Sequence, residues 1–212
     1  MTIEDVIYGQ AWASILALLA AAVIALFALA ARAGLISVQP SLVHLARRAF
    51  LPSAAIVAVV ATWGSLYLSE VAGFIPCEYC WYQRIAMYPL ALILVIAAVT
   101  RDLRVWRYAL PLAVIGAVIS IYHYWLQMNP DGPTACSVGV PCSVRYVDEL
   151  GVVSIPWMAM SAFILIGVLL VVARAVGPVP HGGEAETAHP EGDEDARVLA
   201  APWKSASSPP QG

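Results

Sequence analysis

The sequence predicts an all-α, polytopic membrane protein, and three observations support this class. First, 61% of the 212 residues are hydrophobic and only 12% are charged, whereas soluble domains carry about half apolar and about a quarter charged residues. Second, the apolar residues gather in segments long enough to cross about 30 Å of hydrocarbon as helices. Third, the arginines are distributed between these segments as the topology of a membrane protein requires.

Each apolar segment is apolar on all sides, as burial in lipid or in a helix bundle demands. The first segment has an acidic flank, Glu4 and Asp5, and a longer apolar run than a signal peptide. We therefore expect it to be a retained transmembrane helix. The expected spans are residues 11–31, 50–68, 82–100, 108–126 and 155–176.

The arginines predict the orientation, because cytoplasmic loops are enriched in Lys and Arg. With an odd number of spans, the loop after the first span, the loop after the third span and the end of the fifth span share one face. We expect that face to be cytoplasmic and both cysteine pairs to be extracytoplasmic. The arginines of this face are Arg32, Arg47, Arg48, Arg101, Arg104, Arg107 and Arg174.

The chain divides into three parts. Residues 1–49 form an extra N-terminal transmembrane helix and a basic cytoplasmic loop, and residues 50–176 form a four-helix redox domain. Residues 177–212 are rich in Gly, Pro, Ala, Ser and acids, and they predict a disordered acidic cytoplasmic tail. Outside this tail the acidic and basic residues nearly balance. No basic face therefore suggests a nucleic-acid partner, and the expected environment is the lipid bilayer.

The first cysteine pair, Cys77 and Cys80, has a Cys-x-x-Cys spacing immediately before the third span. This spacing lets two sulfurs close a small, reducible ring. The unpaired N–H groups of a helix N-terminus stabilise a nearby thiolate. Because Cys80 is expected close to that N-terminus, it is predicted to be the more acidic partner.

The second pair, Cys136 and Cys142, encloses five residues that include Gly and Pro. Such a loop is bent and exposed and can close a disulfide. The disulfide has two interpretations: a structural staple of modest stabilising effect, or an exposed bond that a partner's thiolate attacks. A four-cysteine zinc site, built from both pairs, is a third interpretation.

Arg84 and His123 are the polar residues that stand out within the spans. Arg84 follows Cys80 by four residues, so on a helix it shares that cysteine's face one turn deeper. It either reaches back to lipid phosphate or stabilises negative charge on Cys80 or on a reduced acceptor. His123, near the outer end of the fourth span, either belongs to the same site or forms an interfacial hydrogen bond.

Several motifs together resemble the disulfide bond formation protein B (DsbB) family. They are Pro76-Cys77-Glu78-Tyr79-Cys80-Trp81-Tyr82-Gln83-Arg84, Tyr122-His123, Cys142-Ser143-Val144-Arg145 and the Pro156-Trp157 entry to the last span. The resemblance covers about residues 50–176. It implies a four-helix bundle and a quinone-dependent enzyme that reoxidises an extracytoplasmic thioredoxin-fold (DsbA-like) thiol oxidase. The acceptor would be menaquinone or ubiquinone.

The resemblance also implies a role for each site residue. Cys136 would form the mixed disulfide with the partner, and Cys142 would resolve it. Electrons would then pass to the first pair, whose Cys80 would reduce the quinone. The quinone oxygens would be held by Arg84 and His123.

Two features depart from the family pattern: the extra first span and a second cysteine pair spaced as in the Gram-positive members of the family. Two other functions remain as alternatives. One is a vitamin K epoxide reductase-like enzyme, although in that class the loop pair precedes the Cys-x-x-Cys pair. The other is a non-enzymatic membrane protein with stapled or metal-bound cysteines.

Overall fold

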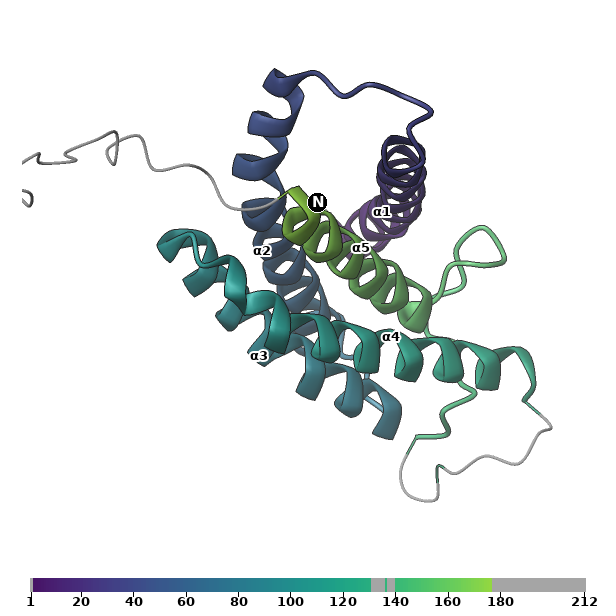
Figure 1. Ribbon diagram of the computed structural model, residues 1–212. Coiled ribbons are helices and arrows are strands. Elements are labelled where there is room, and N and C mark those ends of the chain that lie inside the picture. Colours follow the sequence, from purple (N-terminus) through teal and green to yellow (C-terminus); the bar gives the residue numbers. More distant parts are fainter. Residues whose placement is uncertain (1, 131–135, 137–139, 177–212) are drawn as a thin grey trace, which may run out of the picture. The chain divides into compact units, whose positions relative to one another are not determined.

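The computed structural model describes residues 2–130, 136 and 140–176. Five helices in these ranges are long and apolar enough to cross a membrane, and the same ranges contain no strand. The predicted all-α, polytopic membrane class is therefore confirmed. The predicted disordered tail, residues 177–212, lies outside the described residues. The helices are α1 (Ile3–Arg32), α2 (Pro40–Glu70), α3 (Glu78–Thr100), α4 (Trp106–Met128) and α5 (Ile155–Val176), with a short 3₁₀ helix, η1 (Leu103–Val105), before α4 (Figure 1).

Helices α1 and α2 are longer than the apolar spans that they contain. At the start of α1, the Thr2 hydroxyl accepts a hydrogen bond from the backbone N–H of Asp5, and the Asp5 carboxylate accepts one from that of Thr2. This capping box begins the helix in polar sequence. Helix α2 begins with Pro40 in its first turn, where the missing N–H of proline costs no helical hydrogen bond. Arg47 and Arg48 therefore lie on α2 and not in a loop.

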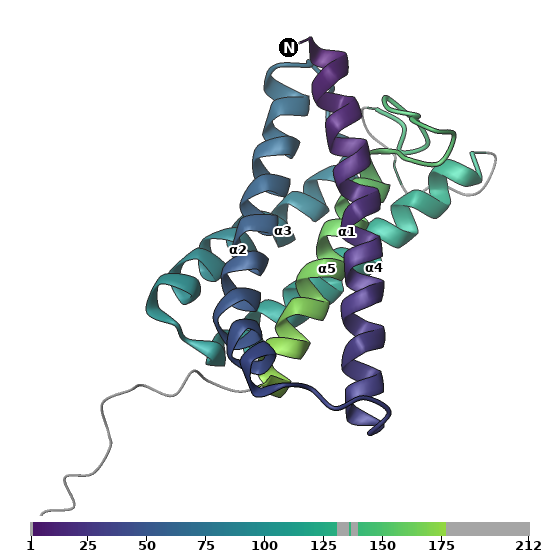
Figure 2. The same cartoon turned by 90° about the horizontal axis from the view of Figure 1, so that it is seen from above.

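Helix α5 packs against α1, α2 and α4, whereas α3 packs mainly on α2 and α4. Figure 2 shows α1 running beside α5, so the extra helix belongs to the same compact unit as the other four. Close packing of α4 on α5 depends on Gly116, because the Phe163 ring occupies the position where a Cβ atom would stand. The large apolar side chains on the outside of the helices suit a lipid surface.

The two ends of the bundle differ in chemistry. One end contains the start of α3, the end of α4 and the start of α5, and it carries the cysteines. At the other end, the Arg174 guanidinium lies 3.8 Å from the centroid of the Trp106 ring, and Arg47 Nε donates to the carbonyl of Val176 at 3.0 Å. The basic side chains used to predict the orientation therefore lie away from the cysteines.

Candidate redox site

The first cysteine pair is formed by the N-terminus of α3. Cys77 is the N-cap residue, with an extended backbone, and Cys80 lies in the first helical turn. The backbone N–H of Trp81 donates to the Cys77 carbonyl at 3.1 Å and closes this turn. The two sulfurs are 3.1 Å apart and form a thiol hydrogen bond. The first helical turn thus holds the two thiols ready to form a disulfide.

The second pair, Cys136 and Cys142, is joined by a disulfide with a Cα–Cα distance of 6.0 Å, which is within the usual range. The two halves of this bond differ in accessibility. Cys142 is 1% exposed, whereas Cys136 is half-buried. A thiolate from a partner protein would therefore reach Cys136 more easily than Cys142.

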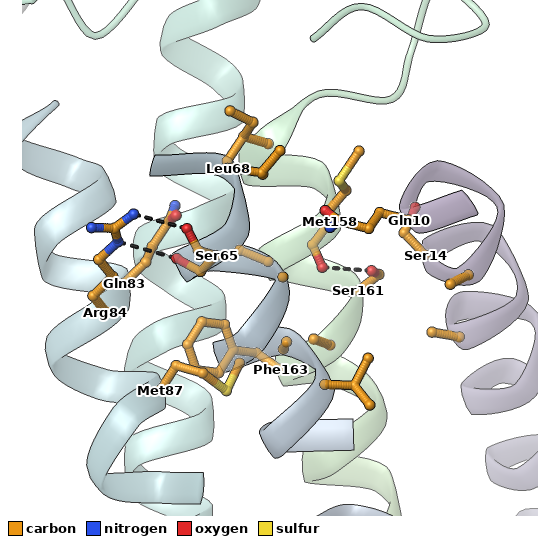
Figure 3. A pocket seen from close by; sticks show the side chains of 18 of the residues that line it. Gln10, Ser14, Ser65, Leu68, Gln83, Arg84, Met87, Met158, Ser161 and Phe163 are labelled. Atoms are coloured by element: carbon orange, nitrogen blue, oxygen red, sulfur yellow. Dashed lines mark hydrogen bonds between the residues drawn. The ribbon is translucent and has the colours of Figure 1, made fainter. Parts of the chain in front are cut away.

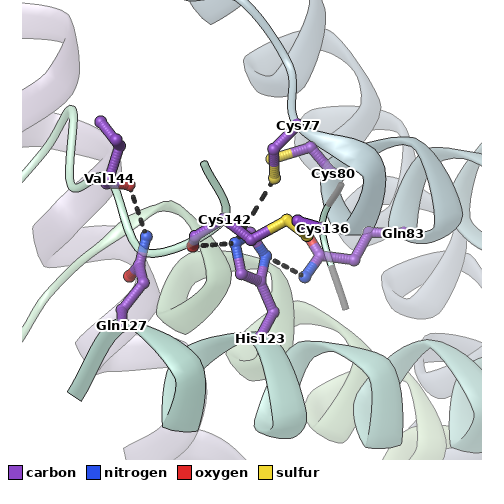
Figure 4. The surroundings of a disulfide bond; sticks show 8 residues. All are labelled: Cys77, Cys80, Gln83, His123, Gln127, Cys136, Cys142 and Val144. Carbon is purple, nitrogen blue, oxygen red and sulfur yellow. Dashed lines mark hydrogen bonds between the residues drawn. A yellow bond between two sulfur atoms is a disulfide. The ribbon is translucent and has the colours of Figure 1, made fainter. Parts of the chain in front are cut away.

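Both pairs belong to one packed cluster, although the sequence separates them by more than fifty residues. Buried Cys77 and Cys142 pack with Leu126, and the half-buried Cys80 and Cys136 lie against them. Figure 4 shows the disulfide beside the Cys77–Cys80 turn, above α4. The fold thus brings the four predicted cysteines together.

His123 links the two pairs. Its Nε2 lies 3.2 Å from the Cys142 carbonyl and 3.5 Å from Cys77 Sγ, and its Nδ1 lies 3.3 Å from Nε2 of Gln83. A carbonyl only accepts hydrogen bonds, so Nε2 carries the proton and points it at Cys142 O and Cys77 Sγ. Nδ1 then accepts from the Gln83 amide. The ring is thus held in one tautomer and aimed at the first pair (Figure 4).

These contacts act on the thiol of Cys77. The hydrogen bond with Cys80 lowers the pKa of Cys77 well below its ordinary value, against the opposing effect of burial, and the hydrogen bond with His123 lowers it further. The prediction that Cys80 would carry the more stabilised thiolate is therefore wrong for this arrangement. The reason is positional, because Cys77 and not Cys80 is the N-cap residue and contacts His123.

Gln83 and Tyr79 are site residues that the sequence reasoning missed. Gln83 is buried on α3, one turn after Cys80, and it orients the His123 ring. The ring of Tyr79 lies against that of His123, with centroids 5.7 Å apart. A buried amide three residues after a cysteine of the pair was a detectable signal, since helical residues at that spacing share a face.

A cavity of about 510 Å³ opens beside Cys80, between helices α1, α2, α3 and α5. Its walls are mostly apolar, and Arg84 supplies the positive charge. The guanidinium donates to the Ser65 hydroxyl at 3.1 Å and to the Ser65 carbonyl at 3.0 Å, and it lies 5.3 Å from the centroid of the Trp81 ring. Figure 3 shows Arg84 held against α2 in this way. Arg84 thus lines the same cavity as Cys80, as the four-residue spacing between them predicted.

His123 does not line this cavity, so the prediction that it would hold an acceptor together with Arg84 is not supported. It instead lines a small second cavity with Cys77 and Cys80. The physical reason is the position of α4, which contacts α3 and α5 but not the large cavity. His123 acts on the cysteines themselves.

The structure also bears on the proposed zinc site. A four-cysteine site needs four thiolates, but Cys136 and Cys142 are bonded to each other. The remaining thiols and His123 place their ligand atoms within 4.8 Å of one another. This set offers three ligands, and its members already bond to one another and to Gln83.

The comparisons with known proteins agree with this site. The family model for disulfide bond formation protein DsbB matches residues 46–175. The chain is 54% identical over 122 residues to disulfide bond formation protein C of Bacillus subtilis, covering 57% of this chain and 88% of the relative. It is 46% identical over 127 residues to a probable disulfide formation protein of Oceanobacillus iheyensis, covering 57% of this chain and 86% of the relative.

A further relative is the probable disulfide formation protein of Metapseudomonas resinovorans. It is 43% identical over 122 residues, which cover 56% of this chain and 85% of the relative. No solved structure matches the chain significantly. The matched family region contains all four cysteines, Arg84 and His123, and it leaves α1 outside.

Proposed function

The chain belongs to the DsbB family of disulfide bond formation proteins, and on this premise we propose that it oxidises an extracytoplasmic thioredoxin-fold thiol oxidase and passes the electrons to a membrane quinone. The family and its relatives establish a membrane disulfide-forming oxidoreductase. The quinone, the partner and the direction of electron flow are the proposed part.

One observation carries the proposal: Cys80 is the one cysteine that lines both cavities. On one side it meets Cys77 and His123 in the small cavity, next to the second pair. On the other side it meets the large apolar cavity that contains Arg84. Cys80 therefore stands between a thiol-exchange centre and a space suited to a membrane-soluble electron acceptor.

The large cavity fits a quinone in size and in chemistry. Its volume of about 510 Å³ lies within the range of small-molecule sites, about 300–1,000 Å³. Its apolar wall suits a hydrophobic ring and tail, and the Arg84 guanidinium supplies donors for a ring oxygen that gains negative charge on reduction. A bound quinone supplies a two-electron, two-proton acceptor and leaves as the quinol.

The first proposed step takes place at the second pair. A thiolate of the reduced partner attacks Cys136, the accessible half of the disulfide, and Cys142 leaves as a thiolate. The second partner thiolate then attacks the partner sulfur of this mixed disulfide and releases Cys136. The partner keeps a disulfide, and Cys136 and Cys142 keep the two electrons.

The second step passes the electrons to the first pair. When Cys77 and Cys80 are joined as a disulfide, a thiolate of the second pair attacks it, and a second exchange releases both sulfurs of the first pair. Cys136 and Cys142 close their disulfide again. The packed cluster that contains all four cysteines supports this exchange, since the pairs need no separate carrier.

In the third step the first pair is oxidised. One proton is shared across the 3.1 Å between the two sulfurs, so its movement from Cys80 to Cys77 places the thiolate at the large cavity. Cys77 and Cys80 then close their disulfide and release two electrons and the remaining thiol proton. His123 stabilises charge on Cys77 until that point, and Arg84 holds positive charge where the acceptor binds.

The proposed orientation places the cysteine end of the bundle outside the cell and the tail in the cytoplasm. One observation and one general rule support it. The arginine-rich loops and helix ends lie at the end away from the cysteines, and cytoplasmic loops are enriched in arginine.

The proposal is tested with the purified chain in detergent, a reduced thioredoxin-fold dithiol protein and either ubiquinone or menaquinone with a short tail. We expect one quinone to be reduced for each disulfide formed in the partner. Cys80→Ser should abolish quinone reduction, and so should Cys136→Ser. Partner oxidation that proceeds equally well without quinone, or normal turnover of Cys80→Ser, would refute the proposed electron path.

A further inference from the structure

Helix α1 lies outside the region that matches the family, residues 46–175, yet it forms one wall of the large cavity. It packs mainly on α5, and the cavity lies between it and α2 and α3 (Figure 3). A helix added to the four-helix domain thus becomes part of the proposed acceptor site. The α1 residues that line the cavity are Gln10, Ala13, Ser14, Leu16, Ala17 and Ala20.

The two polar side chains on this wall differ in their hydrogen bonds. The Ser14 hydroxyl donates to the Ala11 carbonyl of its own helix at 2.6 Å, so its donor is already used. Gln10 Nε2 is buried and has no hydrogen-bond partner among the described residues. A buried amide without a partner is costly in apolar surroundings. Because the Gln10 side chain lines the cavity, a rotation of its terminal amide would direct its N–H donors to an acceptor there.

Gln10 also lies at the level of the charged group in the cavity. Its side-chain amide packs on Gly64, where a Cβ atom would stand 3.3 Å from it. The next residue of α2 is Ser65, which binds Arg84. The Gln10 amide of α1 and the Arg84 guanidinium of α3 thus contact two consecutive residues of α2 from different sides.

The positions of Gln10 and Arg84 along their own helices also correspond. Gln10 and Arg84 lie a similar number of residues from the cysteine-side ends of their helices, α1 and α3. At 1.5 Å per residue, each is about 10 Å below its helix end. Gln10 and Arg84 therefore lie at similar depths along the two helices.

We propose that the Gln10 amide is a second hydrogen-bond donor to the quinone ring, which makes the extra helix α1 part of the acceptor site. This inference rests on the proposed function. It assigns to α1 the recognition of the quinone head group, in a site where the matched family region supplies Cys80 and Arg84. Gly64 has a supporting role, since the absent side chain leaves room for the amide.

The test compares Gln10→Leu with Gly9→Ala in the full chain. Gln10→Leu removes the amide and keeps the side chain large and apolar. Gly9 is the preceding residue, and a Cβ atom there meets nothing within 4 Å. We measure the Kd of a short-tailed ubiquinone by quenching of tryptophan fluorescence, and the KM values for the quinone and for the partner dithiol.

Loss of one neutral hydrogen bond predicts that Gln10→Leu raises the Kd and the KM for quinone about 3- to 10-fold, with the KM for the partner unchanged. Gly9→Ala should match the unmodified chain. Gly64→Ala, which pushes the amide aside without removing it, should weaken quinone binding in the same direction. It also provides a second test if Gln10→Leu folds poorly.

The outcomes separate the two proposals. One outcome is that the unmodified chain reduces quinone while Gln10→Leu and Gly64→Ala bind it as well as Gly9→Ala does. In that case the role of Gln10 is refuted and the proposed function stands. If the unmodified chain neither binds nor reduces quinone, the proposed function fails and the role of Gln10 fails with it.

Discussion

Replacement of His123 by alanine tests the central contact of the site. The change removes the Nε2–H group that lies 3.5 Å from Cys77 Sγ and 3.2 Å from the Cys142 carbonyl. Without this donor, the Cys77 thiolate loses one of the two partners that lower its pKa, and the Cys80 hydrogen bond remains. We therefore expect the pKa of Cys77 to rise towards its ordinary value.

The geometry sets the size of this change. A hydrogen bond to a charged group contributes about 1.5–3 kcal/mol, and this one belongs at the lower end, because a single N–H group is shared between a sulfur and a carbonyl. About 1.5 kcal/mol corresponds to about one pKa unit. Since a lowered pKa keeps the thiolate present at a pH below the ordinary pKa, the variant should lose thiolate only on the acidic side. Above the ordinary cysteine pKa of about 8.5 the two proteins should agree.

The assay is alkylation of the fully reduced chain by iodoacetamide over a series of pH values, with the modification of Cys77 measured by mass spectrometry. At a pH below both midpoints, His123→Ala should react about tenfold more slowly, as a shift of about one unit requires. The matched control is Gln127→Ala. Gln127 is a buried residue one turn further along α4 and bonds the Val144 carbonyl, not a cysteine. An unshifted midpoint in His123→Ala, or an equal shift in the control, would refute the role given to His123.

Three further predictions follow from other parts of the molecule. Arg84→Ala should raise the KM for quinone at least tenfold while the KM for the partner stays the same, since a charged donor contributes about 1.5–3 kcal/mol; unchanged quinone dependence would return Arg84 to a lipid-binding role. Gly116→Ala should destabilise the chain by about 1–3 kcal/mol, because its Cβ atom would overlap the Phe163 ring; thermal unfolding checks this against Gly167→Ala, whose Cβ atom would lie 3.9 Å from its nearest neighbour. In intact cells treated with a reductant, a membrane-impermeant maleimide should label Cys136 from outside, and labelling that requires permeabilised cells would overturn the orientation.

The spans could be predicted because lipid imposes a simple rule on sequence: a crossing helix is apolar on all sides and about twenty residues long. Hydropathy does not locate the ends of a helix that continues beyond its apolar span into polar sequence. Helix α1 begins at Ile3 because of the capping box between Thr2 and Asp5, and α2 begins at Pro40. Polar residues mark the start of α1, and a proline marks the start of α2. A search for apolar runs does not detect either.

The parts of the site that could be predicted are those whose residues lie close together in the sequence. The two cysteine spacings indicated the reactive pairs, and the four-residue step from Cys80 to Arg84 placed both on one helix face. The neighbours of His123 depend on how α4 packs against α3 and on where the second loop lies, and no local pattern encodes these. The large cavity is less predictable still, because one of its walls comes from α1, a helix distant in the sequence from the cysteines.

The accessibilities of the four cysteines support one direction of electron flow. Exposure is greater at Cys136 than at Cys142 and Cys77, which are 1% and 7% exposed, and in the proposed scheme the partner's thiolate therefore enters at the second pair. Beyond the buried sulfurs, Cys80 opens onto a cavity of mainly apolar lining among the transmembrane helices, which suits a small membrane-soluble molecule and not a protein. A partner that reached Cys80 directly would need access through this apolar wall. In the proposed scheme, the burial of Cys77 and the apolar surroundings of Cys80 keep the protein substrate apart from the lipid-soluble one, and the second pair acts as the intermediate between them.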